Sequence, residues 1–176
     1  MRNTSFLAVG LGLLLVQSNL FRVLDRFGHP EVIPSLLLPL ILFMGVHEYS
    51  LSRGAGVAFF LGYATDLVGI APIGLYTFTS VALFLLARAA GVRLAAQTRS
   101  MQAALALAFA SVESVMVLVL IAIFGRDAYV PRALYPLAVP HVLATAAVAP
   151  LVFFLAERLH AATGPSTRAE PGGGRA

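Results

Sequence analysis

Long apolar runs dominate this chain and leave little of it polar enough to face water. Six such runs follow one another, and 59% of the 176 residues are hydrophobic while only 11% are charged. Ordinary soluble domains carry roughly 25% charged residues. A chain this small cannot bury so much apolar surface in water, because its surface is large relative to its volume. The composition excludes soluble, disordered and disulfide-stabilised proteins and predicts an all-α, polytopic membrane protein.

The apolar runs predict six transmembrane helices. A helix needs roughly 20 apolar residues to cross the bilayer core, so there is room for almost no extramembrane domain. Pro34 is expected in the first turn of the second helix, and Pro39 is expected to kink it. A tight turn is expected at residues 52–54, before the third helix. The predicted spans cover residues 6–21, 33–51, 55–68, 75–90, 101–124 and 133–156.

The six spans form one domain, residues 1–162, followed by a tail, residues 163–176. The tail is rich in glycine and proline and lacks the apolar surface needed to fold, so we expect it to be disordered. Basic residues predict the orientation. With six spans, eight arginines adjoin the side that carries both termini and four adjoin the other side. Basic residues favour the cytoplasmic side, so both termini are predicted to be cytoplasmic.

Residues for metal or catalytic chemistry are sparse. The chain has no cysteine, which excludes thiolate ligands and a cysteine nucleophile. His47 and Glu48 begin like a zinc-protease helix, but Leu51 occupies the position that needs the second histidine. No Ser–His or Ser–Lys arrangement accompanies the few acids. The arginines are scattered rather than gathered into a nucleic-acid-binding patch. We therefore predict no catalytic residue, no metal, no cofactor and no nucleic-acid partner.

One face of the third predicted helix combines small residues with an acid. Gly62, Asp66 and Gly69 fall within an arc of about 60° at 100° per residue. Small residues allow a neighbouring helix to approach closely. An acid inside a span costs about 2.5–3.5 kcal/mol at the bilayer centre and should face protein or water. Two interpretations stay open: a contact for a partner or ligand, and a polar clasp or cap within the chain, on the turn from Gly69 to Gly74.

Three further polar residues lie inside predicted spans. Glu113 is near the middle of the fifth span, and His141 in the sixth is its expected cationic partner. Gln17 in the first span has a depth similar to that of Asp66 and His141. These four residues are candidates to line one cavity in the outer half of the membrane. The alternative is ordinary hydrogen bonding between helices, worth roughly 0.6 kcal/mol per bond in a membrane.

Several short motifs in the first half of the chain follow one another in an order that is found in a known protein family. Residues 16–20 (VQSNL) close the first span, and Pro34 opens the second. Residues 60–69 (FLGYATDLVG) are then followed by residues 72–75 (PIGL). In this order, over about residues 14–90, the sequence resembles the MreD family of bacterial rod shape-determining membrane proteins. The resemblance adds Pro72 and Gly74 to Gly62, Asp66 and Gly69 as an expected partner or helix-packing face.

Three residues depart from the family pattern. Ser35 follows Pro34 where the family often has an acid. Tyr63 and Thr65 stand in the third span where leucines are usual. These departures leave the predicted topology unchanged.

The resemblance implies a non-enzymatic component of the cell-elongation machinery in the bacterial inner membrane. Such a protein is needed for rod shape and coordinates peptidoglycan synthesis with the cytoskeleton. The implied partners are an MreC-like protein and, through it, MreB, RodA and a penicillin-binding protein, together with membrane lipid.

The resemblance also implies a fold similar to the substrate-binding subunits of energy-coupling-factor vitamin transporters. A vitamin-binding subunit is therefore one alternative function. A small proton-coupled transporter that uses Asp66 or Glu113 is another.

Overall fold

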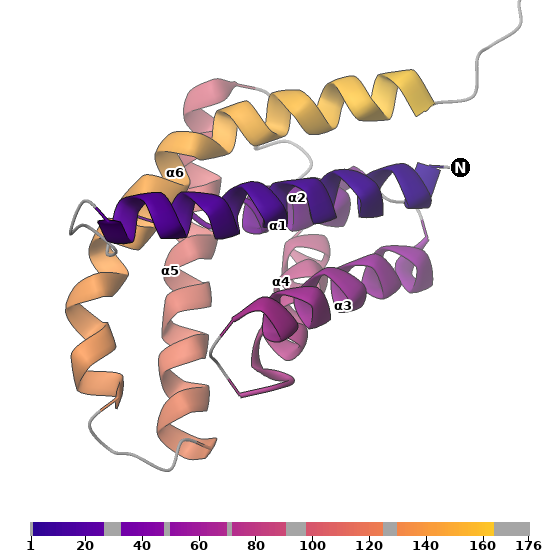
Figure 1. Cartoon of the computed structure of the whole chain (residues 1–176). Coiled ribbons are helices and arrows are strands. Elements are labelled where there is room, and N and C mark those ends of the chain that lie inside the picture. The colour runs from indigo at the N-terminus through magenta and orange to yellow at the C-terminus, as the bar shows by residue number, and fades with distance from the viewer. Residues whose placement is uncertain are drawn as a thin grey trace, which may run out of the picture.

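The computed structural model describes residues 2–26, 33–47, 50–69, 72–90, 98–124 and 130–163. Within these residues the regular secondary structure consists of helices, without strands, which confirms the all-α prediction. The predicted disordered tail falls almost entirely outside the described residues. The helices, drawn in Figure 1, are α1 (Arg2–Arg26), α2 (Leu37–His47), α3 (Leu51–Val68), α4 (Leu75–Ala89), α5 (Arg99–Phe124) and α6 (Val130–Thr163).

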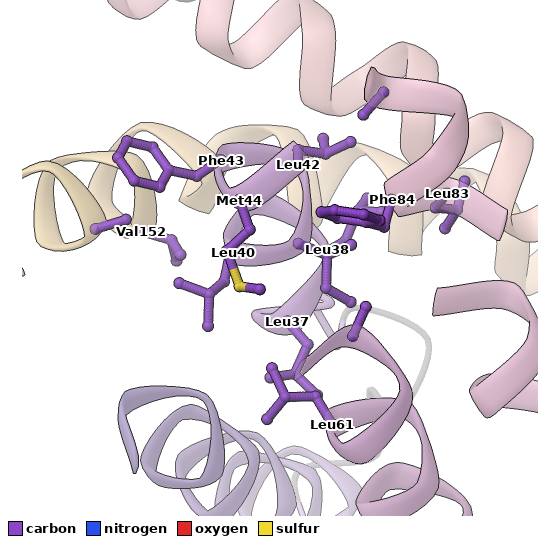
Figure 2. Close-up of a cluster of buried hydrophobic side chains, with 14 of the residues drawn as sticks. Leu37, Leu38, Leu40, Leu42, Phe43, Met44, Leu61, Leu83, Phe84 and Val152 are labelled. Atoms are coloured by element: carbon purple, nitrogen blue, oxygen red, sulfur yellow. The ribbon is translucent and has the colours of Figure 1, made fainter. Parts of the chain in front are cut away.

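The short helix α2 lies at the centre of the molecule. Residues 37–46 are all buried, and α2 contacts each of the other five helices. Figure 2 shows its side chains directed towards Leu61 of α3, Phe84 of α4 and Val152 of α6. A helix that is apolar all round its circumference must be surrounded by other apolar groups. The leucine-rich second run therefore forms the core of the fold.

Two helical hairpins surround α2. Helices α3 and α4 pack together, and so do α5 and α6. Figure 1 shows that α6 bends sharply along its length, while α1 lies beside its C-terminal part. Pro140 and Pro150 lie in the interior of α6. An interior proline removes a backbone hydrogen bond and kinks a helix, which accounts for a bend in this helix.

The second and third helices differ from the sequence prediction. Helix α2 begins at Leu37, so Pro39 rather than Pro34 lies in its first turn, where the missing N–H has no helical acceptor to lose. The expected turn at residues 52–54 is instead helical, because α3 begins at Leu51 and the Gly54 N–H donates to the Ser50 carbonyl at 3.1 Å. Gly54 is buried and belongs to the packed part of α3.

Two helices have the length and composition expected of membrane spans. Within the described residues these are α5 and residues 137–162 of α6. Three other apolar stretches are shorter: residues 4–20 of α1, α2 and α4. Helix α2 has 11 residues, about 16 Å at 1.5 Å per residue, against a bilayer core of about 30 Å. Of the six described helices, two therefore have the length and composition of a full membrane crossing.

Candidate functional site

The carboxylate of Asp66 binds the N-terminus of helix α4. It is buried, and it accepts four hydrogen bonds from residues 74–77. The donors to Oδ2 are the Gly74 N–H at 2.9 Å, the Thr77 N–H at 3.0 Å and the Thr77 hydroxyl at 2.5 Å. The Tyr76 N–H donates to Oδ1 at 2.8 Å. The first N–H groups of a helix lack helical acceptors and carry a partial positive charge, so an anion there is favourable.

Gly62 provides the close approach between α3 and α4. A Cβ atom at this position would lie 2.7 Å from the Thr77 Cα and 2.7 Å from the Tyr76 carbonyl oxygen. These are backbone atoms and cannot move aside cheaply. Gly62 and Asp66 lie one helical turn apart and hold the same end of α4. The sequence left two interpretations of this face: a contact for a partner or ligand, and a polar clasp within the chain. The contacts of Gly62 and Asp66 with α4 correspond to the clasp within the chain.

The other three residues of the predicted face form the exposed tip of the hairpin. Gly69, Pro72 and Gly74 are exposed, and Ile73 between them is 75% exposed. Gly74 has φ 100°, in the left-handed region that favours glycine. The Leu75 N–H donates to the Pro72 carbonyl at 3.2 Å and closes the turn. The tip therefore presents the largely exposed apolar side chain of Ile73.

Gln17 and His141 meet at the non-helical residues that precede α2. The Gln17 Oε1 accepts from the Leu36 N–H at 3.0 Å, and the His141 Nδ1 donates to the Ile33 carbonyl at 2.6 Å. The Thr145 hydroxyl oxygen accepts from the Ser35 N–H at 2.9 Å. Buried backbone outside a helix needs such partners, above all in a membrane.

The four residues that were predicted to line one cavity therefore lie at separate places in the fold. Asp66 has its hydrogen-bond partners in α4, whereas Gln17 and His141 have theirs before α2. The sequence analysis missed Thr145 and noted Ser35 only as a departure from the family pattern. Thr145 lies one turn after His141 on the same helix face, which is a weak signal. Ser35 takes part through its backbone N–H, so its residue type carries no signal.

Glu113 does not form the expected pair with His141. Within the described part of the chain, its Oε2 atom is buried without a hydrogen-bond partner. It interacts electrostatically with Tyr76 of α4, as Asp66 also does.

At the opposite end of α2, His47 stacks on Phe43 with ring centroids 4.1 Å apart. Its ring centroid is 5.8 Å from that of His160 in α6. The described residues contain no group of three or more side chains suited to hold a metal ion. Glu48 of the protease-like motif lies outside the described residues.

The close approach at Gly62 predicts a position-specific effect of one methyl group. Gly62→Ala should lower the free energy of unfolding by about 1–3 kcal/mol, because the packed backbone of α4 leaves no room. The matched control is Gly56→Ala in the same helix, where nothing lies within 4 Å of the added Cβ. Thermal unfolding of the purified protein in detergent measures both. Equal melting temperatures for the two variants would contradict the close approach.

The four bonds to Asp66 predict a graded series of variants. Asp66→Leu removes every acceptor and should cost about 2–3 kcal/mol of stability. Asp66→Asn keeps one acceptor oxygen but turns an NH₂ group towards an N–H donor, so its loss should be smaller but clear. The same unfolding experiment ranks the variants. An Asp66→Asn protein as stable as the wild type would show that the second oxygen contributes nothing.

A comparison with protein-family models identifies the chain. The model described as rod shape-determining protein MreD matches residues 2–160, well beyond the region that carries the resemblance in sequence. Searches of curated proteins and of solved structures gave no match. The family match covers both hairpins and the central helix. The chain therefore belongs to the MreD family of rod shape-determining proteins, which are membrane proteins.

Proposed function

We propose that this protein is a non-enzymatic scaffold of the bacterial cell-elongation machinery. The observation that carries the proposal is the family match over residues 2–160. In this role the protein sits in the inner membrane, contacts an MreC-like protein and, through it, MreB, RodA and a penicillin-binding protein. It coordinates peptidoglycan synthesis with the cytoskeleton and transports nothing.

The hydrogen bonding of the buried polar residues supports a scaffold. Asp66, Gln17 and His141 each bind backbone groups of the same chain. These bonds fix the position of α4 and of the residues before α2. Side chains that hydrogen-bond the protein's own backbone stabilise its framework. No observation favours a vitamin-binding subunit or a proton-coupled transporter.

The exposed hairpin tip is the part of the predicted partner face that remains accessible. Pro72, Ile73 and Gly74 lie at the outer membrane surface in the proposed topology, which has six spans in residues 1–162 and both termini cytoplasmic. The Gly74 N–H donates to Asp66, and Gly74 adopts a left-handed conformation directly before α4. An exposed apolar side chain next to backbone that Asp66 holds suits contact with another protein, because burying it there removes apolar surface from its surroundings.

The topology is testable with single cysteines, because the natural chain has none. Cysteines at Gly28, Ile73 and Ala128 should react with an impermeant thiol reagent in cells whose outer membrane has been permeabilised. Cysteines at Gly91 and Gly164 should react only after the inner membrane is opened. Labelling of Gly164 from outside would overturn the six-span topology.

The tip predicts a functional variant that leaves the fold intact. Ile73→Asp should round the cells and reduce co-purification of the MreC-like protein by about tenfold, the loss expected for a buried apolar contact. Stability should not change, because Ile73 is exposed. Val23→Asp is the control, since Val23 is 51% exposed and lies near the end of α1. Rod-shaped cells with Ile73→Asp at normal protein abundance would argue against contact at the tip.

A further inference from the structure

The outer face of helix α6 near its C-terminal end carries one cation among apolar side chains. Leu151, Phe154 and Leu155 are 69%, 46% and 43% exposed, and Arg158 is exposed as well. These four residues are three or four positions apart, so they lie on one face of the helix. They belong to the apolar stretch 137–162, which is long enough to cross a membrane. Figure 1 shows this part of α6 at the edge of the molecule, so the face is turned away from the rest of the chain.

The side chain of Arg158 folds back along the helix. Its Cζ atom lies 4.7 Å from the centre of the Phe154 ring, one helical turn earlier. The guanidinium is therefore directed towards the middle of the apolar stretch and away from its end at Ala162. Arginines near the end of a membrane-spanning helix ordinarily extend towards water. Contact between the cation and the ring face leaves the N–H donors of the guanidinium for other partners.

Within the described residues no acid forms an ion pair with Arg158. The neighbouring carboxylate, Glu157, accepts a hydrogen bond from the Gln102 amide of α5 at 3.1 Å. Adjacent residues of a helix do not face each other, so Glu157 is directed towards α5 and away from Arg158. A cation held among apolar side chains needs a counter-ion, because apolar surroundings do not solvate its charge.

We propose that Arg158 binds the phosphate of an anionic phospholipid whose acyl chains lie along Leu151, Phe154 and Leu155. The planar guanidinium fits a phosphate group with two parallel hydrogen bonds. A phospholipid presents its phosphate and its apolar chains in the same order as α6 presents Arg158 and the apolar residues before it. The lipid site goes beyond the proposed function and is separate from the protein contact at the hairpin tip.

Charge complementarity favours an anionic lipid over a zwitterionic one. The headgroup of a zwitterionic lipid carries its own cation, which competes for the phosphate and repels Arg158. An anionic headgroup such as that of phosphatidylglycerol has no such cation. Basic side chains near a membrane surface attract anionic lipids for this reason.

The lipid site is tested with a tryptophan reporter, because the natural chain contains no tryptophan. The Leu155→Trp protein is reconstituted into vesicles of equal parts phosphatidylglycerol and phosphatidylcholine. In each of two samples one of these lipids carries bromine atoms, which quench tryptophan fluorescence on contact. Quenching should show that phosphatidylglycerol is favoured at the reporter by about fivefold, the preference expected for one basic residue at a membrane surface. Equal quenching by the two lipids would overturn the proposal.

Two arginine variants of the reporter protein separate a specific site from general attraction by surface charge. Arg158→Gln removes the charge but keeps a long polar side chain, and it should abolish the preference for phosphatidylglycerol. The matched control is Arg99→Gln, which removes an exposed arginine from the same end of the α5–α6 hairpin, as the bond between Gln102 and Glu157 shows. This control should retain most of the preference. A preference that survives Arg158→Gln, or equal losses in the two variants, would overturn the proposal.

The lipid site and the proposed function fail in different ways. If Ile73→Asp rounds the cells while phosphatidylglycerol is not favoured at the reporter, only the lipid site is wrong. If the preference for phosphatidylglycerol depends on Arg158 while cells that lack the protein keep their rod shape, the proposed function is wrong and the lipid site stands.

Discussion

The hydrogen bonds between Asp66 and the start of helix α4 are the interaction on which the arrangement of the core depends. They fix α4 against α3, and the central helix α2 packs on both. Gly62 allows this geometry because any side chain there would meet the backbone of α4. Close helix packing without side chains and satisfied polar groups are the two forces that hold helices together where the hydrophobic effect between them is absent.

The same physical requirement explains the residues before α2. A non-helical segment buried among helices needs acceptors and donors from side chains. Gln17 of α1 and His141 and Thr145 of α6 supply them, so helices from both ends of the chain converge on residues 33–36. These bonds set where α2 begins and hence how far it extends. The two ends of the chain are thereby connected through the core.

Glu113 is the exception to this pattern within the described residues. Asp66, Gln17 and His141 all have partners inside the chain, whereas the buried oxygen of Glu113 has none. From Glu113 to the end of α5 at Phe124, every residue is half-buried or exposed.

The sequence by itself determined the helical class, the approximate positions of the helices and the family, because apolar runs and short motifs are local properties of the chain. It also identified Asp66 and Gly62 as a pair on one helix face, since helical spacing alone places them there. Tertiary structure decided what that face contacts, because a carboxylate binds donors equally well in a partner or in the next helix. It also decided that residues 52–54 are helical, that α2 has only 11 residues, and that His141 binds the Ile33 carbonyl rather than Glu113. These outcomes depend on which backbone groups lie within hydrogen-bonding distance after the helices pack, and that distance is not encoded in any local pattern.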